Sequence, residues 1–153
     1  MAELTLQVEV RAPVEVVWAA ATDWVGQSSW VFATTVRPTH RDGRGVGGRL
    51  EAFTGVGKVG FLDPMQITSW EPPHRCVVLH LGRVVRGSAA FEVEPVGTAG
   101  ARLVWTEWLV PPLGLLGQLG FLLVRPFAAA GIQRSLRTFA RLVESGELPA
   151  VAA

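Results

Sequence analysis

Apolar and polar residues alternate along most of the first two thirds of the chain. From Leu4 to Val10 every second residue is apolar and the residues between them are polar, the pattern of a strand with one solvent-facing side. The same criteria, with Gly, Pro and Asp turns as boundaries, predict strands at 32–40, 49–54, 58–62, 65–70, 76–81, 85–94 and 102–110. Asp63 and Pro64 interrupt one of these, which predicts a bulge or bend that curves the sheet. Short turns join the strands, so we predict an antiparallel meander.

Helical spacing replaces alternation in three places. Pro13 suits the first turn of a helix, and apolar residues recur at helical spacing over 14–21. Residues 24–30 contain two tryptophans without alternation and predict a second short helix or a turn. The chain after residue 110 is predicted to be helical, with a break at Pro126, because proline removes an amide donor and clashes with the preceding turn.

The second half of the last helix is amphipathic. Ile132, Leu136, Phe139 and Val143 share one face, which predicts that this half packs on the sheet. Residues 1–146 therefore form one predicted domain, and 147–153 a loose C-terminal tail.

Composition narrows the function classes. The net charge of +1 gives no field that would attract nucleic acid. Cys76 is the only cysteine, so no intramolecular disulfide can form, and we expect a reducing cytoplasm. The N-terminus has no basic start followed by an apolar block, and we expect no export.

One uncharged stretch resembles a membrane segment. From Leu109 to Val124 there is no charged residue. This run is shorter than the roughly 20 residues that a bilayer requires, and two prolines, at 111 and 112, and three glycines interrupt it. We predict a buried or interfacial helix rather than a span.

Four motifs occur in an order that resembles the START/Bet v 1-like (SRPBCC) superfamily. They are Val10–Trp18, Gly45–Arg49, Trp70–Arg75, and the pair Phe91–Gly97 and Ala101–Trp105. The resemblance is closest to the polyketide cyclase/dehydrase-like branch. It implies an α+β helix-grip fold: a curved antiparallel sheet of six to seven strands around a long C-terminal helix, with two short helices after the first strand and an apolar ligand cavity. The stretch Leu113–Val124 is more apolar and richer in glycine than this family's closing helix.

Such a cavity needs apolar walls and a few polar groups. Alternation assigns Leu103, Trp105 and Glu107 to one inward face. The complete set of expected cavity residues is Phe53, Phe61, Met65, Ile67, Val77, Leu79, Ala89, Phe91, Leu103, Trp105, Glu107, Leu119, Leu123 and Phe127.

Two polar residues are candidates for chemistry. Glu107 has apolar neighbours on its face, where burial would raise its pKa and suit it to proton transfer; the alternative is that it reaches solvent at the cavity mouth or pairs with an arginine. His80 has apolar residues on both faces of its strand, so its direction stays open; pointing inward, it could orient a ligand or act as a base. We expect no metal site and no cofactor, since His74, Cys76 and His80 form only a loose cluster.

Three functions remain open. The first is binding of a small hydrophobic molecule such as a polyketide, lipid, isoprenoid or quinone. The second is a cyclase or dehydratase that uses Glu107 or His80 for proton transfer. The third is a membrane-surface or protein-interaction module that uses Leu113–Val124. We expect a cytoplasmic monomer or homodimer, with peripheral membrane contact in the third case.

Overall fold

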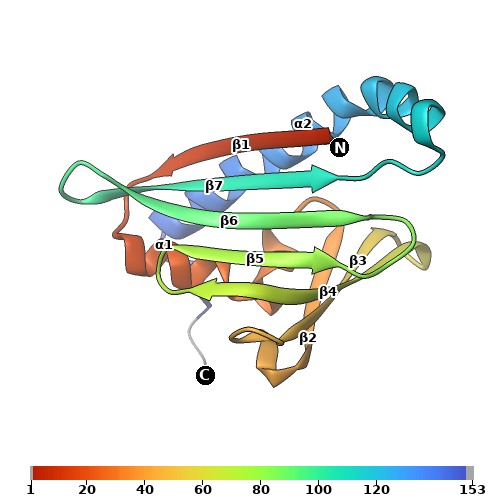
Figure 1. Ribbon diagram of the computed structural model, residues 1–153. Helices are drawn as coiled ribbons and strands as arrows, with labels where there is room; N and C mark the ends of the chain where they lie inside the picture. Colours follow the sequence, from red (N-terminus) through yellow and green to blue (C-terminus); the bar gives the residue numbers. More distant parts are fainter. Residues whose placement is uncertain (1, 151–153) are drawn as a thin grey trace.

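The computed structural model describes residues 2–150, which fold into one antiparallel sheet and a long C-terminal helix (Figure 1). The strands are β1 (Ala2–Val10), β2 (Thr34–His40), β3 (Arg49–Val56), β4 (Val59–Glu71), β5 (Arg75–His80), β6 (Gly87–Val96) and β7 (Gly100–Leu109). The helices are α1 (Val14–Ala21), the short 3-10 helices η1 (Val25–Ser29) and η2 (Arg41–Gly43), and α2 (Gly114–Glu144). The expected order of strand, two short helices, further strands and long helix is confirmed.

The strands lie in the order β1-β7-β6-β5-β4-β3-β2, and every neighbouring pair is antiparallel. The second half of α2 packs across one face of this curved sheet. Leu136 and Phe139 from α2, Val17 from α1 and Leu103 from β7 are fully buried together. The helix-grip fold and its seven strands are therefore as the resemblance implied.

The expected interruption at Asp63 and Pro64 is wrong, because β4 runs without a break from Val59 to Glu71. Pro64 pairs with Glu51 on β3, while the pairing with β5 begins only at Met65. Proline is tolerated here because it has a strand partner on β3 but none on β5, so no ladder hydrogen bond requires its missing N–H. Its carbonyl accepts from the amide of Leu81 at 2.7 Å. The register shift lies further along, between Ile67 and Ser69.

The expected break of the last helix at Pro126 is also wrong. α2 continues through this proline for 31 residues, and Pro126 is exposed, so the lost hydrogen bond lies on the solvent side. Figure 1 shows the N-terminal part of α2 projecting past the end of the sheet. By length and composition α2 could cross a membrane, and no residue of its most apolar 18-residue window is buried.

The expected loose tail from residue 147 is anchored in its described part. Leu148 is 4% exposed and belongs to the core. The amides of Glu147 and Leu148 donate to the carbonyl of Leu142 at 2.9 and 3.1 Å, and the amide of Ala150 donates to Asp23 at 3.2 Å. Residues 151–153 of the expected tail lie outside the described residues.

Candidate functional site

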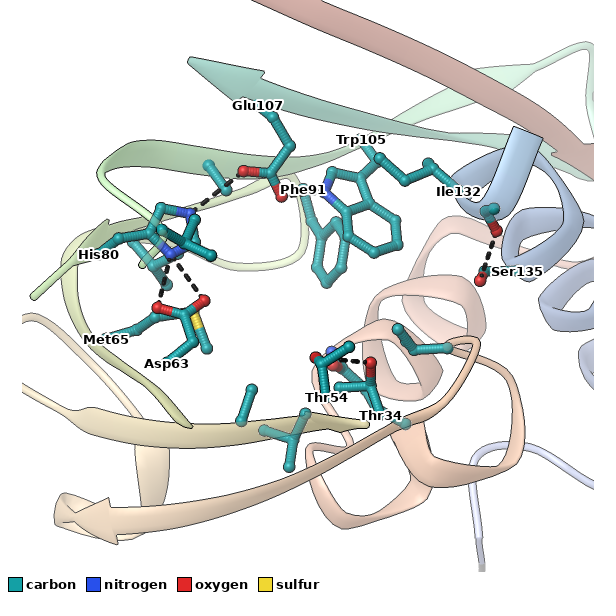
Figure 2. Close-up of a pocket in the computed structure, with 18 of the residues that line it drawn as sticks. Thr34, Thr54, Asp63, Met65, His80, Phe91, Trp105, Glu107, Ile132 and Ser135 are labelled. Carbon is teal, nitrogen blue, oxygen red and sulfur yellow. Dashed lines mark hydrogen bonds and ion pairs between the residues drawn. The ribbon is translucent and has the colours of Figure 1, made fainter. Parts of the chain in front are cut away.

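The sheet and α2 enclose a cavity of about 430 Å³. Its walls come from all seven strands, from η1 and the residues on either side of it, and from α2 between Phe127 and Ser135. Figure 2 shows these side chains arranged around an open centre. Phe32 and Phe127 line the cavity and are also 58% and 78% exposed, so they mark its opening.

A buried ionic cluster forms one end of the cavity. The Nδ1 atom of His80 lies 3.0 and 2.9 Å from the two carboxylate oxygens of Asp63, and its Nε2 atom lies 3.1 Å from Oε2 of Glu107. The indole of Trp105 donates to the other oxygen of Glu107 at 2.8 Å. A histidine that meets a carboxylate at both ring nitrogens donates at both only as the imidazolium. The cluster is thus two carboxylates joined by one cation.

Sheet register brings the three residues of the cluster together. His80 pairs with Met65, two residues after Asp63 on β4. Glu107 pairs with Ala89 on β6, and Gly87, two residues before Ala89, pairs with His80. Residues two apart share a face of a strand, so all three side chains point to the inner side.

The carboxylates set the protonation of His80. Burial alone lowers its pKa, but the hydrogen bonds to Asp63 and Glu107 and the attraction of both charges outweigh that effect and raise the pKa from 6.5 to about 9. The side chain of His80 is 4% exposed. His80 is therefore charged near neutral pH and has no free nitrogen lone pair for base catalysis.

Hydroxyl groups lie at the other end of the cavity. Thr34 and Thr54 lie 3.0 Å apart on neighbouring strands, and the Thr34 hydroxyl donates to the carbonyl of Phe32. The hydroxyl of Ser135 on α2 accepts from the amide of Phe32 at 2.9 Å and donates to the carbonyl of Gly131 at 2.9 Å. These contacts tie α2 to the segment that leads into β2.

An aromatic wall separates the two polar ends. The rings of Phe91 and Trp105 meet edge to face with centroids 5.2 Å apart, and Trp30 packs against both at 6.0 Å. Trp30 also meets Phe139 of the core at 4.8 Å. Phe91 and Trp105 line the cavity, and Trp30 lies behind them. Such pairs gain about 1 kcal/mol beyond their buried area, which stabilises this arrangement of the rings.

Most of the expected cavity residues on β6 and β7 line the cavity, and several on β3 to β5 do not. The lining includes Phe61, Met65, His80, Ala89, Phe91, Trp105, Glu107 and Phe127. Leu103 and Ile67 are buried in the core and lie outside the lining. Contrary to expectation, Phe53, Val77, Leu79, Leu119 and Leu123 also lie outside it, and Leu79, Leu119 and Leu123 are exposed.

Two causes explain these differences. On β5 the inward residues are Cys76, Val78 and His80, so Val77 and Leu79 take the outer face; alternation left the parity open because both faces are apolar. Leu119 and Leu123 lie on the part of α2 that projects past the sheet. The sequence alone does not identify Asp63 as a site residue, because the Asp63-Pro64 pair predicts an interruption between two strands rather than a strand position. Its burial at 8% exposed follows only from the continuous β4.

Comparisons with known proteins agree with this geometry. A sequence profile of the family described as "Polyketide cyclase / dehydrase and lipid transport" matches residues 1–144. No curated protein matches the chain.

Solved structures with the same fold cover nearly the whole chain. The Zhui aromatase/cyclase from Streptomyces sp. R1128 has a TM-score of 0.78 at 14% identity, with 99% of each chain covered. TTHA0849 from Thermus thermophilus has a TM-score of 0.75 at 18% identity, with 95% of this chain and 99% of the other covered. The di-domain ARO/CYC BexL of the BE-7585A biosynthetic pathway has a TM-score of 0.73 at 18% identity, with 97% of this chain and 48% of that protein covered. At these identities the similarity concerns the fold.

Proposed function

Because the chain belongs to the polyketide cyclase, dehydrase and lipid transport family, we propose that it binds a small hydrophobic molecule in the cavity between the sheet and α2. The observation that carries the proposal is the cavity itself: about 430 Å³, with mostly apolar walls and a single ionic cluster at one end. Apolar walls supply affinity at about 25 cal/mol per Å² of buried apolar area. The few polar groups orient the guest.

Binding explains the polar cluster better than catalysis does. A general base needs a free lone pair aimed at the substrate, whereas both ring nitrogens of His80 are directed at carboxylates. Glu107 accepts from His80 at one oxygen and from Trp105 at the other, so both of its oxygens already have a donor within the protein. A cyclase or dehydratase that uses these residues remains the alternative, and Glu107→Gln separates the two: a catalyst loses turnover while it keeps its ligand.

Native mass spectrometry of the purified protein, followed by extraction and identification of the bound molecule, tests the binding proposal. The expected result is a copurified apolar molecule in the wild type and its loss in Ala89→Phe, which places a ring inside the cavity. Ser88→Phe places the same ring on the other face of β6 and serves as the control. Equal retention in both variants would overturn the proposal.

We further propose that the projecting part of α2 contacts an anionic membrane surface. The specific observation is a set of exposed apolar side chains that includes Leu113, Leu115, Leu116, Leu122 and Leu123, each more than half exposed. No Asp or Glu occurs between Glu107 and Glu144. Arg125 lies on α2, and Arg86 lines a depression together with the first turns of α2. The exposed Glu3 of β1 also lies beside Arg125, which donates to its carbonyl at 3.2 Å. Exposed apolar side chains with arginines beside them suit an interface with anionic lipid.

The apolar surface also adjoins the cavity. Val85 and Leu109 line both the cavity and a second depression formed with Val110 and the first turns of α2. A guest that enters or leaves near Phe127 would therefore pass close to the proposed membrane contact. This arrangement favours exchange of the ligand with a bilayer.

Vesicle sedimentation tests the membrane contact. Phosphatidylglycerol vesicles should carry down the wild type, and Leu116→Asp with Leu123→Asp should abolish this, because aspartate is costly in the interface. The matched control is Val56→Asp with Val59→Asp, two residues that are each 81% exposed on the β3–β4 turn. Equal sedimentation of both double variants would overturn the contact. The cytoplasmic location itself stays a prediction.

A further inference from the structure

The hydrogen-bond donors of the cavity wall are almost all in use within the protein. Both nitrogens of His80 face carboxylates, and Trp105 donates to Glu107. Trp24 donates to the carbonyl of Gly43 at 2.7 Å, and Gln27 donates to that of Ala21 at 3.1 Å. The hydroxyls of Thr34 and Ser135 also donate to backbone carbonyls. Because the Thr34 hydroxyl is used in this way, the Thr54 hydroxyl is the donor in the 3.0 Å contact between the two. One amide hydrogen of Gln27 and the weakly donating thiol of Cys76 remain. The indole N–H of Trp30 has no partner, but it is buried outside the cavity lining.

Acceptors, in contrast, are in excess. Each carboxylate has about four lone-pair sites. The groups that meet Asp63 and Glu107 are His80, which meets both, and Trp105, which meets Glu107. Both side chains are largely buried, at 10% and 12% exposed. Buried acceptors without donors are costly, so this end of the cavity favours a guest that brings a donor.

The charge of the wall points the same way. The cluster combines two acidic side chains with one basic side chain, a formal net charge of −1. Among the residues that the structure describes, no Lys or Arg lines the cavity. The one cation in the lining is His80, whose two N–H groups already meet carboxylates. An anionic guest would therefore face two carboxylates in a poorly solvated space without a free donor to pair with.

From this inventory we infer that the cavity selects apolar molecules that donate a hydrogen bond from a hydroxyl group, as phenols and alcohols do, and excludes apolar carboxylates. The inference rests on the proposed binding function and specifies its ligand class. The hydroxyl donates to a free lone pair of Glu107 or Asp63, while the hydrocarbon part lies against Phe91, Trp105 and Met65 (Figure 2).

Calorimetric titration with naphthalene, 2-naphthol and 2-naphthoic acid near neutral pH tests the inference, because the three share a ring system and differ in one group. A hydrogen bond to a charged acceptor contributes enough for 2-naphthol to bind at least about tenfold more tightly than naphthalene. 2-Naphthoic acid should bind at least about tenfold more weakly than naphthalene. Equal binding of the three would overturn the ligand class and leave the proposed function standing, whereas no binding of any would overturn both.

Variants assign the selectivity to the cluster. Glu107→Gln removes one negative charge and adds an amide donor, so the ratio of the 2-naphthol and 2-naphthoic acid affinities should fall by about tenfold. Asp63→Asn should act in the same direction and provides a second test should the first variant fail to fold. Glu92→Gln changes a carboxylate that pairs with Arg75 outside the cavity lining and should keep the wild-type ratio. A wild-type ratio in both cluster variants would overturn the assignment.

Discussion

The buried imidazolium of His80 predicts how stability depends on pH. Its pKa is about 9 in the folded protein and 6.5 when unperturbed, so the folded state holds a proton that the unfolded chain releases above about pH 6.5. The stabilisation is complete below 6.5 and is lost as the pH rises through about 9. Each pKa unit corresponds to about 1.4 kcal/mol, which gives a total loss on the order of 3 kcal/mol over this window. The side chain is 4% exposed, so solvent screening reduces this little.

Urea denaturation measured across this pH window provides the assay. The free energy of unfolding of the wild type should fall steadily from slightly acidic to alkaline pH. In His80→Gln the curve should be lower at acidic pH and nearly flat, because Asp63 and Glu107 then face each other without a cation. His74→Gln, an exposed histidine in a turn, should keep the wild-type slope. A flat or rising wild-type curve, or an unchanged slope in His80→Gln, would refute the reasoning.

Three further predictions concern packing and reactivity. Phe139→Ala should lower the free energy of unfolding in urea titrations by about 3–5 kcal/mol, because Phe139 is fully buried. The control Phe127→Ala, at an exposed residue, should change it by less than about 0.5 kcal/mol. Equal losses in the two variants would contradict the assigned core. Burial raises the pKa of the Cys76 thiol to about 12, so a disulfide reagent should label it slowly in the native protein and rapidly in denaturant; fast native labelling would contradict its burial. Gly87→Ala should lower the free energy of unfolding by about 2 kcal/mol or more, since φ is +116° and a Cβ would collide with the backbone of β7. Gly57→Ala, where φ is +60° and the space is open, should lower it by only about 1 kcal/mol in the same titrations. A larger loss at Gly57 than at Gly87 would contradict the close approach of β7 to Gly87.

The strands and the order of the elements could be predicted because each depends on local patterns. The alternation at Leu4–Val10 and on the last two strands reports one buried face directly, and β1, β6 and β7 have the expected inner faces. On β5 both faces are apolar, so alternation could not choose between Val77 and Val78. The choice is made by register with the neighbouring strands, which is a tertiary property.

The ionic cluster could be predicted only in part, for a related reason. Glu107 and His80 are predictable as candidates because each is polar within an apolar strand. Their contact, however, depends on the pairing of β5 with β6 and of β6 with β7, which local sequence does not show. Asp63 gave the opposite signal, since an Asp-Pro pair is typical of a turn. Its side chain reaches the inner face of the sheet only because β4 continues through this position.

Intermolecular nuclear Overhauser effects between bound 2-naphthol and the protein test the central claim most directly. We expect contacts from the naphthol ring to the methyl groups of Met65 and Ala89 and to the indole of Trp105, all of which line the cavity. Contacts confined to Leu116 and Leu123 on the projecting part of α2 would show that the molecule binds outside. That result would contradict the account.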